Sequence, residues 1–496
     1  MPLTAAQRDR AVGALLATAA GDALGAGYEF RPPMPSKTAV AMIGGGLGSF
    51  ARGEWTDDTS MAIAIAEVAA TGADLRDHTA QDQIVERWAE WAPTAKDIGI
   101  QTRQVLGSAV KNGLSAASTL RASIDLHHRT GHTAGNGSLM RTAPVALAYL
   151  DDEDGLVEAA RAISELTHYD PEAGDACVLW CLAIRHAVLT GKIDPRIGLG
   201  HIDRERRDLW AARLAEAEAT QPSSFSGNNG WVVKALQGAW SAIANTPEPV
   251  EDPAAEVFRA DRLRLALEAA VRGGGDTDTV AAIAGGLLGA AYGASAIPAH
   301  WRMALHGWPG LNSRGLIRLA DRIIDKGRPD TFDYTYNGFP EAREAVQHPY
   351  DDKVWLGGFA ALRHLPSDVD AVVTLCRVAD EDLPTGVQHV DVRLIDQEGE
   401  NDNLDFVLLD TVRAIEQLRA DGRTVFVHCV QAYRSTGHAN VALDPTKRCT
   451  TSSPYSKAPT RTRISAQHCA ASPRRQALRR KPTHVVTPER QRRWGI

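Results

Sequence analysis

Two short clusters of carboxylates and hydroxyls each stand where an apolar helical pattern begins. They lie in GEWTDDTSMAIAIAE (53–67) and RGGGDTDTVAAIAGG (272–286). A helix N-cap needs one such side chain, and each cluster supplies more than one. Oxygen donors are the ligands that Mg²⁺ and Mn²⁺ prefer, whereas zinc recruits His or Cys. Capping explains either cluster alone, but two clusters of the same design predict one shared metal site. The side chains concerned are Thr56, Asp57, Asp58, Asp276, Asp278 and Thr279.

A third polar stretch, GHTAGNGSLMRTAPVAL, precedes another apolar helical segment. Backbone amides that are free at such a place can receive a phosphate, although Gly-Asn-Gly is also a common turn. In SELTHYDPEAGDACVLWC, His168 precedes a helix and is either a ligand contact or a loop histidine with a structural partner. The candidate binding residues are Gly135, Asn136, Gly137, Ser138 and His168.

A different kind of chemistry is suggested far along the chain by VFVHCVQAYRSTGHAN (425–440). An apolar strand pattern ends at Cys429, and Arg434 follows in the next loop. A thiolate beside an arginine is suited to binding and attacking a phosphate. This stretch is therefore a second candidate site.

The first candidate site depends on helices. From about residue 5 to 324 the pattern is helical nearly throughout, with Ala-rich and Leu-rich segments separated by Gly, Pro and Asn clusters. A small residue every four positions makes a ridge on which a neighbouring helix can pack closely. Such ridges are formed by Gly13, Ala17, Gly21 and Gly25 and by Gly285, Gly289 and Gly293.

The second candidate site depends on a different architecture. Residues 326–352 are irregular and rich in proline and aromatic residues, which predicts a linker between an all-α domain (1–325) and a second domain. The segments VWLGG, VDAVVTL, VQHVDVRLI and TVFV are typical of strands, and a helix is expected from about residue 404 to 420. A small α/β domain is therefore predicted over 353–440. Residues 441–496 show neither period and have a composition typical of disorder.

Charge divides the chain at the same place. The net charge of −7 combines −18 for residues 1–440, with 41 basic and 59 acidic residues, and +11 for residues 441–496, with 13 and two. An acidic body does not favour nucleic-acid binding. A basic tail is typical of a nucleic-acid or membrane arm, or arises from a change of reading frame.

Cysteine use and hydropathy indicate a cytoplasmic protein. Six cysteines in 496 residues make no disulfide framework, and Cys177 and Cys181 lie in an apolar helical stretch as expected for buried free thiols. The apolar N-terminal run lies between Arg10 and Asp22, which favours a core helix over an export signal. The Ala- and Gly-rich run 280–299 is not expected to span a membrane. We expect a monomer with no membrane partner.

Five motifs together resemble the ADP-ribosylglycohydrolase family, the relatives of the dinitrogenase-reductase-activating glycohydrolase. The resemblance covers roughly residues 8 to 325, and the paired TDDT and DTDT motifs are its most specific part. The motifs occur in the family's order and approximate spacing: GDALGAGYEF (21–30), WTDDTSM (55–61), GNGSLMR (135–141), THYDPEAGDA (167–176) and GGDTDTVAAIAGGLLGA (274–290).

The resemblance implies an all-helical fold with a binuclear Mg²⁺ or Mn²⁺ centre at the base of an ADP-ribose cleft. It also implies a gating glutamate near the metals at Glu29, a loop from Gly135 to Ser138 that contacts the distal ribose and phosphates, and a cleft lined by His168. By the same carry-over, the metal ligands would be Thr56, Asp57, Asp58, Asp276, Asp278 and Thr279.

The implied reaction is hydrolysis of the bond between ADP-ribose and an acceptor, either an ADP-ribosylated protein or a small ADP-ribosylated molecule. It needs stabilisation of an oxocarbenium-like transition state and an activated water. Two divalent cations can supply the second, and Asp57, Asp58 or Glu29 could take the proton. The rival interpretation is a non-catalytic ADP-ribose binder or structural protein on this fold. Such a protein should have lost metal ligands, and here every motif position is filled.

The stretch around Cys429 resembles the dual-specificity and tyrosine phosphatases, whose signature is His-Cys, five residues, Arg, then Ser or Thr. By that resemblance Cys429 would be the nucleophile, Arg434 would bind the phosphate oxygens, and Asp396 would be the general acid. Asp380 and Asp382 are the alternative acids. The C-terminal domain would then be a Cys-dependent phosphatase.

The downstream half departs from that signature. Only four residues separate Cys429 from Arg434, and no helix of useful length follows. A shortened loop should displace the guanidinium by about 3 Å, and a displacement of about 1 Å can cost on the order of a hundredfold in rate. We therefore expect an impaired phosphatase-like domain. A reading-frame shift near codon 433 would explain the departure and the basic tail, and a functional basic arm is the alternative.

Overall fold

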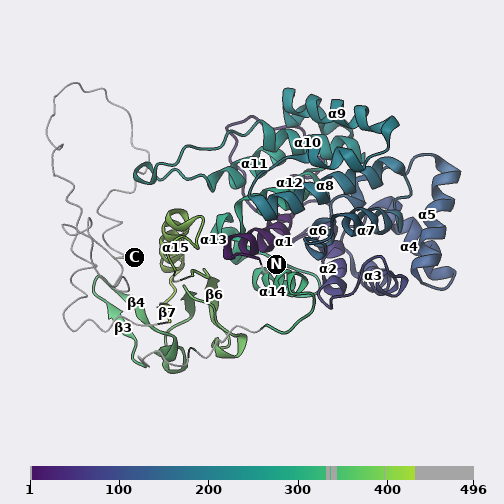
Figure 1. The fold of residues 1–496 in the computed structure, drawn as a ribbon. Coiled ribbons are helices and arrows are strands. Elements are labelled where there is room, and N and C mark those ends of the chain that lie inside the picture. The colour runs from purple at the N-terminus through teal and green to yellow at the C-terminus, as the bar shows by residue number, and fades with distance from the viewer. Residues whose placement is uncertain (1–2, 331–335, 337–342, 396, 431–496) are drawn as a thin grey trace, which may run out of the picture.

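A helical part and a sheet part make up the described structure. The computed structural model describes residues 3–330, 336, 343–395 and 397–430 (Figure 1). Arg434, Asp396 and the predicted disordered tail 441–496 lie outside these residues.

The helical part confirms the prediction of a mostly helical first domain. Apart from short 3₁₀ turns and a two-stranded ribbon, β1 (His306–Gly307) with β2 (Leu311–Asn312), its regular elements are α-helices. They are α1 (Ala5–Gly25), α2 (Asp57–Ala69), α3 (His78–Trp91), α4 (Ile100–Lys111), α5 (Ala116–Thr130), α6 (Ala143–Ala148), α7 (Glu153–Glu165), α8 (Pro171–Thr190), α9 (Arg204–Ala219), α10 (Val232–Ala244), α11 (Asp261–Arg272), α12 (Thr277–Tyr292), α13 (Ala299–Ala304) and α14 (Ser313–Ile324).

Helices α1 and α12 lie side by side at the centre of this part, and glycine makes their approach possible. A Cβ added at Gly21 would lie 2.1 Å from the carbonyl oxygen of Ala281, and one at Gly289 would lie 2.0 Å from that of Gly13. No side chain fits at these distances, so the two backbones touch directly. The predicted small-residue ridges therefore pack against each other.

Helix α8 also belongs to the core. It is the one described helix that is long and apolar enough to cross a membrane, and 78% of its apolar window is buried inside the protein. Cys177 and Cys181, on this helix, are buried free thiols, as expected.

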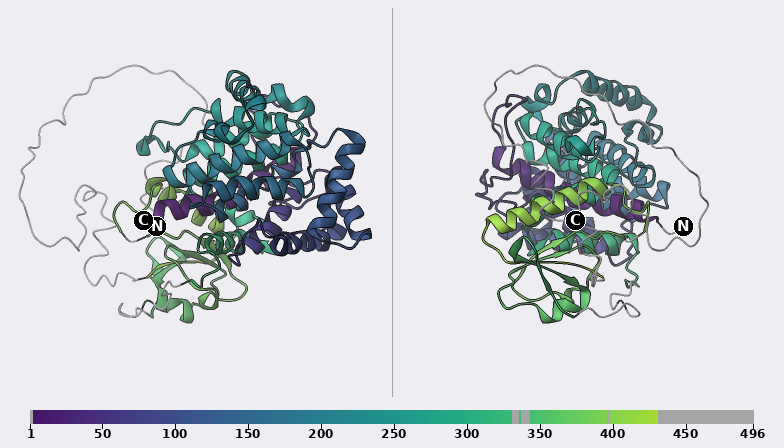
Figure 2. Two further views of the ribbon diagram at one scale, coloured as in Figure 1. Left: turned by 45° about the vertical axis from the view of Figure 1, so that its right-hand side comes forward. Right: turned by 90° about the vertical axis from the view of Figure 1, so that its left-hand side faces the viewer.

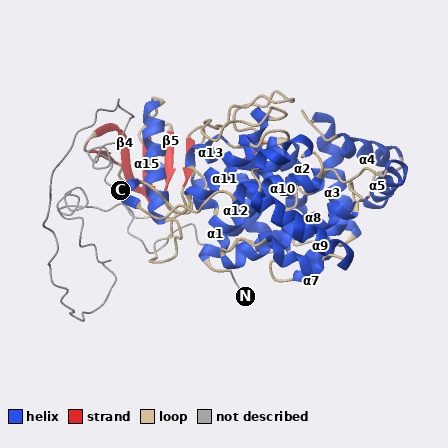
Figure 3. Ribbon diagram, turned by 90° about the horizontal axis from the view of Figure 1, so that it is seen from above, coloured by secondary structure: helices blue, strands red, loops and turns tan. Residues whose placement is uncertain are grey.

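The sheet part is a five-stranded sheet with the order β3-β4-β7-β5-β6. Its neighbours are parallel except for the pair β3 and β4. Helix α15 (Leu404–Ala420) lies beside it, between the sheet and the helical part (Figures 2 and 3). The strands are β3 (Val346–His348), β4 (Asp351–Gly358), β5 (Ala371–Thr374), β6 (Gln388–Asp391) and β7 (Val425–Cys429).

The four predicted strands and the predicted helix are all present, although the sheet begins earlier than its expected boundary. Strand β3 and the first residues of β4 lie inside 326–352, the expected linker. Prolines and aromatic residues obscured this hairpin, because Pro349 stands in the turn between its two strands. Within that segment, residues 331–335 and 337–342 are not described.

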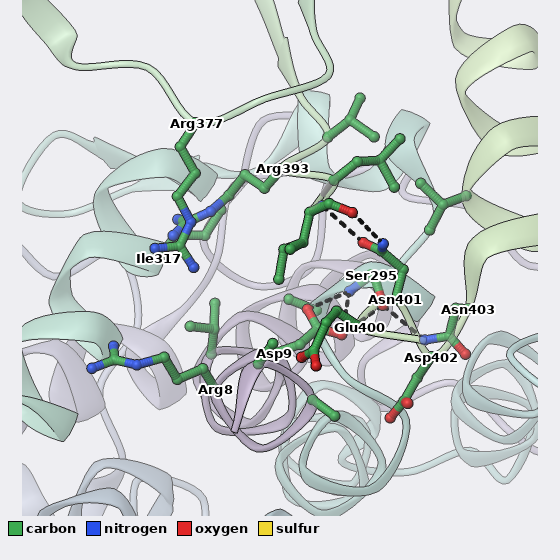
Figure 4. Close-up of a pocket in the computed structure, with 18 of the residues that line it drawn as sticks. Arg8, Asp9, Ser295, Ile317, Arg377, Arg393, Glu400, Asn401, Asp402 and Asn403 are labelled. Atoms are coloured by element: carbon green, nitrogen blue, oxygen red, sulfur yellow. Dashed lines mark hydrogen bonds between the residues drawn. The ribbon is translucent and has the colours of Figure 1, made fainter. Parts of the chain in front are cut away.

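The two parts share an interface with polar and apolar contacts. The Asp410 carboxylate on α15 accepts a hydrogen bond of 2.7 Å from the backbone amide that begins α13, at Ala299. Phe258 and Phe406 pack edge to face across the interface, with ring centroids 5.8 Å apart. A cavity of about 70 Å³ lies at the same boundary, and its lining includes Arg8, Asp9, Ser295, Arg393 and Asn403 (Figure 4).

Candidate active site

The two predicted acidic clusters meet at the N-termini of α2 and α12. Thr56 is the N-cap of α2, and Asp57 and Asp58 lie in its first turn. Asp276 is the N-cap of α12, and Asp278 lies in its first turn. The positive end of each helix dipole therefore faces carboxylates. The structure thus brings together two sequence segments that were linked beforehand only by their similar design.

The contact between α1 and α12 positions one of these turns. The Thr277 hydroxyl donates a hydrogen bond of 2.9 Å to the Gly25 carbonyl, and a Cβ at Gly25 would lie 2.5 Å from the Asp278 backbone. Asp278 is therefore placed by backbone packing and not by a flexible loop.

The carboxylates form two triads that share Asp278. Oxygens of Asp22, Asp58 and Asp278 all lie within 4.8 Å of one another, and so do oxygens of Glu29, Asp276 and Asp278. Thr56 lies beside the first triad, because its hydroxyl donates to Asp58 Oδ2 at 3.0 Å. The Thr279 amide donates to Asp278 Oδ1 at 3.0 Å.

Asp22 is a site residue that the sequence prediction missed. It is fully buried in α1, and its Oδ2 accepts hydrogen bonds from the amide and hydroxyl of Thr59 at 3.0 and 2.6 Å. The Thr56 amide donates to its two oxygens at 2.9 and 3.1 Å. Asp22 therefore fixes the first turn of α2. A carboxylate in the last turn of an Ala- and Gly-rich apolar helix was the signal that could have revealed it.

Burial and mutual repulsion hold these carboxyl groups toward their neutral forms. Burial raises the pKa of Glu29 to about 8, with Asp276 and Asp97 adding to the effect. Burial, Asp97 and Asp22 raise the pKa of Asp57 to about 7. The pKa values of Asp58 and Asp278 are raised well above their usual range by burial and the neighbouring aspartates. Carboxyl groups whose pKa values are raised in this way have no nearby positive charge that compensates their ionised forms.

The residues present fit divalent cations. Oδ1 of Asp58 and Oε2 of Glu29 are buried oxygen atoms without a hydrogen-bond partner. Buried polar atoms normally have hydrogen-bond partners, so buried carboxylate oxygens without one, next to other carboxylates, are typical of a cation-binding site. All the donors are oxygen, which favours Mg²⁺ or Mn²⁺ over zinc.

The predicted binding loop is attached to this cluster. In the 3₁₀ turn Asn136–Ser138, the Asn136 side-chain amide donates to Asp276 Oδ2 at 2.6 Å and to the Asn229 carbonyl at 2.9 Å. The Asn229 side chain accepts from the Asp276 amide at 3.0 Å and donates to the Gly274 carbonyl at 3.0 Å. Asn229 is a second missed residue. Its Gly- and Asn-rich loop showed no pattern that distinguished it from a turn.

His168 lies against the same loop, whereas the Ser138 side chain points elsewhere. A Cβ added at Gly135 or Gly137 would lie 3.2 Å from His168 Nε2. The Ser138 hydroxyl is buried and accepts hydrogen bonds from Ser164 at 2.9 Å and from the Cys177 thiol at 3.5 Å. Its hydroxyl is thus committed to the core, and a ligand contact is left to its backbone.

The second candidate site lies in the sheet part. Cys429 ends β7, next to Gly358 of β4 in the register, and is half-buried. A hydrogen bond that the Cys376 thiol donates to Cys429 is the main cause that raises the pKa of Cys376, followed by burial. The side chain before it, His428, is engaged with Thr374 at 3.1 Å, which also contacts His389 at 2.8 Å. The two partners predicted for Cys429, Arg434 and Asp396, lie outside the described residues.

Comparisons with known proteins match the helical part. The family model of ADP-ribosylglycohydrolase matches residues 3–331. The ADP-ribosylarginine hydrolase Tri1 of Pseudomonas putida (strain GB-1) is 31% identical over 323 residues, which are 64% of this chain and 78% of that protein. The ADP-ribosyl-[dinitrogen reductase] glycohydrolase of Rhodospirillum rubrum is 30% identical, over 59% of this chain and 89% of its own. The ADP-ribosylhydrolase ARH3 of Bos taurus is 26% identical, over 60% and 88%.

These matches cover the segment whose motifs carried the resemblance, and the expected phosphatase-like domain stays a prediction. The acidic clusters, the glycine-containing loop and His168 come together in that segment, and the family model spans all of them. The chain therefore belongs to the ADP-ribosylglycohydrolase family, through residues 3–331.

Proposed function

We propose that the helical part hydrolyses the glycosidic bond between ADP-ribose and an acceptor, with two Mg²⁺ or Mn²⁺ ions bound at the carboxylate triads. The observation that carries this proposal is the pair of triads that share Asp278, built at two helix N-termini beside the Asn136 loop. The proposed ligands are the predicted Thr56, Asp57, Asp58, Asp276, Asp278 and Thr279, together with Asp22 and Glu29 as members of the triads.

When bound, two such cations lower the pKa of a coordinated water and orient the ribose hydroxyls. The protein's own residues then fix the ligand and move the proton. Among the three candidate bases, Asp58 is fully buried and accepts from Thr56, whereas Asp57 and Glu29 are partly exposed. Glu29 and Asp58 each have a buried oxygen without a hydrogen-bond partner, and of the two only Glu29 is partly exposed. We therefore propose Glu29 as the proton acceptor, a role that needs a carboxylate within reach of the attacking water.

We also propose arginine as the acceptor. Two relatives, from Pseudomonas putida and Serratia proteamaculans, carry the name ADP-ribosylarginine hydrolase. A guanidinium is a cation, and Asp97 adds negative charge at the partly exposed side of the cluster, where it raises the pKa of Glu29 and Asp57. An acidic rim of this kind attracts a cationic acceptor and gives no advantage to a neutral serine oxygen.

The test is release of ADP-ribose from peptides with ADP-ribosyl-arginine or ADP-ribosyl-serine, in Mg²⁺, Mn²⁺ or EDTA. We expect release that requires the metal and is faster from the arginine peptide. Preference for serine would contradict the proposed acceptor but leave the reaction intact. Tight ADP-ribose binding without turnover in any metal would contradict catalysis and support the non-catalytic binder.

Glu29→Gln tests the proposed proton acceptor, and Mn²⁺ affinity is measured on the same variant because Glu29 also belongs to a triad. The substitution keeps the shape of the side chain and one oxygen, so ADP-ribose binding should change little while turnover falls about a hundredfold, as for loss of a general base. Unchanged turnover in this variant would assign the base to Asp57.

A further inference from the structure

His168 has one ring nitrogen bound inside the protein and one directed at the binding loop. The residue is 2% exposed. Its Nδ1 lies 2.7 Å from the Thr167 hydroxyl oxygen. Its Nε2 lies 3.2 Å from the position of a Cβ at either Gly135 or Gly137. The imidazole is therefore held at one edge, with its other edge beside the loop that has no side chains at these two positions.

The direction of the bond between Thr167 and His168 is set by a third residue. The Arg141 Nη2 atom donates to the Thr167 hydroxyl oxygen at 2.8 Å and to the Ile163 carbonyl at 3.2 Å. A guanidinium donates and never accepts. One lone pair of the Thr167 oxygen is thus occupied, and the hydroxyl hydrogen is left to find an acceptor.

That acceptor is His168 Nδ1. Within the described residues, the Thr167 hydroxyl has two hydrogen-bond partners, Arg141 and His168. If Nδ1 carried the proton, both partners would donate to the same oxygen, and the hydroxyl hydrogen would be buried without an acceptor, since Thr167 is fully buried. Buried donors are normally satisfied. The arrangement therefore places the imidazole proton on Nε2.

Arg141 is suited to this role because it is itself immobile. It is fully buried, and its guanidinium lies over the Trp88 ring, 4.1 Å from the centroid. Arg141 thus donates to the Thr167 hydroxyl, and this hydroxyl donates to His168 Nδ1. The His168 proton is left on Nε2. Burial, with Arg141 adding to it, lowers the pKa of His168 well below its usual value. The ring therefore stays neutral, with one proton.

We propose that Arg141 and Thr167 are positioning residues that fix His168 as an Nε2–H donor, and that this donor binds an oxygen of ADP-ribose held against Gly135 and Gly137. No described residue forms a hydrogen bond to Nε2. The identity of the ligand rests on the proposed function, whereas the tautomer does not. The ligand atom is a phosphate or ribose oxygen, since only an acceptor can pair with this nitrogen.

The tautomer is measured directly by ¹⁵N NMR on the full chain labelled at histidine, with His168 assigned by its loss in His168→Gln. We expect a single Nε2–H signature in the unmodified protein and in Thr167→Ser, which keeps the hydroxyl. In Thr167→Val, which has the shape but no hydroxyl, we expect a mixture of both tautomers. An Nδ1–H or doubly protonated ring in the unmodified protein would overturn the proposal.

Binding of ADP-ribose supplies the second readout. Loss of one directed hydrogen bond should weaken ADP-ribose affinity about tenfold in Thr167→Val and raise KM more than it lowers kcat. Thr167→Ser should restore most of the affinity. Thr411→Val is the matched control, since it removes a buried hydroxyl whose one partner among the described residues is the Val407 carbonyl, at 2.7 Å in α15. Unchanged affinity in Thr167→Val would contradict the proposal.

The two proposals fail separately. If the chain cleaves no ADP-ribosyl bond but binds ADP-ribose with the same dependence on the Thr167 hydroxyl, the proposed function is wrong and the positioning role stands. If cleavage occurs and Thr167→Val alters neither the tautomer nor KM, the positioning role is wrong. A fall in thermal stability with kcat and KM unchanged would show that Thr167 serves only the fold.

Discussion

The two candidate sites both stand at the ends of regular elements, but they differ in how their polar atoms are satisfied. At the helix N-termini, carboxylates from α1, α2 and α12 converge, and Asp58 and Glu29 each leave an acceptor without a partner. At the end of β7, His428 and Thr374 bond each other, and Cys429 hydrogen bonds with Cys376. The first site has carboxylates placed so that they could bind a cation. At the second site the described imidazole and hydroxyl groups are paired, and one buried oxygen beside them, Oδ1 of Asp391 at the end of β6, has no hydrogen-bond partner.

An unpartnered buried atom does not by itself mark a site, because Arg213 and Gln237 also have one. At the helix N-termini, however, two such oxygens lie among three further carboxylates. A cysteine, a histidine and nearby aspartates suggested chemistry in the sheet part. The described contacts of Cys429 and His428 are those of a packed strand end. The alternative acids Asp380 and Asp382 form ion pairs with Arg314 and Arg363. In the helical part, the candidate groups include atoms whose contacts within the protein are incomplete. Four predictions can break or sharpen this contrast.

Asp278→Asn should have the largest effect, because Asp278 belongs to both triads. We expect release of ADP-ribose to fall about a thousandfold, on the order of 4 kcal/mol of transition-state stabilisation. Thermal unfolding in EDTA should move to higher temperature, since one buried carboxyl is removed from a repulsive cluster. Added Mn²⁺ should no longer raise the melting temperature. A variant that keeps the response to Mn²⁺ would show that the shared triad is not the metal site.

The two regions should respond to pH in opposite directions. Burial lowers the pKa of His428 and His389 from 6.5 to about 4, so each stays neutral when folded and takes up a proton more readily when unfolded. The free energy of unfolding of the sheet part should therefore be highest above pH 6.5 and should fall as the pH falls toward 4. At pH 5 the expected loss is about 2 kcal/mol for each histidine. In EDTA, the raised pKa values of Asp22, about 6, and Asp57, about 7, make stability of the helical part fall as pH rises through them.

Hydrogen exchange, corrected for the intrinsic pH dependence of amide exchange, separates the two effects. Amides of β5 and β7 should lose protection between pH 7 and pH 5, while those of α1 and α12 in EDTA should gain it. If protection changed in the same direction in both parts, the interface would couple them into one unfolding unit. The two sites would then not differ in their response to pH.

Gly21→Ala tests the backbone contact beneath the carboxylates. The new Cβ would meet the Ala281 carbonyl oxygen at 2.1 Å, so α1 and α12 must separate, at a cost of about 3 kcal/mol, with loss of activity as Asp22 and Asp278 move apart. Gly107→Ala is the matched control on α4, where a Cβ meets nothing within 4 Å, and it should stabilise by about 0.5–1 kcal/mol. Urea unfolding measures both. Equal effects would show that glycine acts there only through chain flexibility.

Cys429→Ser should have the smallest effect. We expect equal, near-zero phosphatase rates for the variant and the unmodified chain with a phosphotyrosine peptide, and unchanged release of ADP-ribose. A rate that depends on Cys429 would establish a second active site and contradict the expected impairment.

Sequence reasoning could predict the candidate site of the helical part because its signal is local. TDDT and DTDT place several oxygen donors within one helical turn, and glycines at every fourth position announce close packing. Asp22 escaped because its function lies in a long-range contact: its partners Thr56 and Thr59 are 34 and 37 residues away. Asn229 escaped for the same reason, since its bonds to Gly274 and Asp276 cross 45 and 47 residues.

The start of the sheet and the directions of side-chain hydrogen bonds could not be predicted from the sequence, for other reasons. Strand β3 is three residues long and follows a proline-rich stretch, so its own sequence does not indicate a strand. It forms because it pairs with β4. The role of Ser138 depends on which way its hydroxyl turns, and it turns toward Ser164. The arginine of GNGSLMR, Arg141, looked like the end of a motif. Its burial and its hydrogen bond to the Thr167 hydroxyl, which only the structure shows, indicate that it fixes the orientation of that hydroxyl.

The glycine-mediated contact between α1 and α12 also constrains how the chain can be made. The bond from Thr277 to Gly25 spans 252 residues, so the first helix emerges from the ribosome long before its partner exists. Until α12 has been synthesised, α1 lacks the partner that contacts it most closely among the described helices, and its Ala- and Gly-rich surface stays uncovered. A nascent chain stopped before residue 277 should therefore lack a metal site altogether, which couples the onset of activity to the end of helical-domain synthesis.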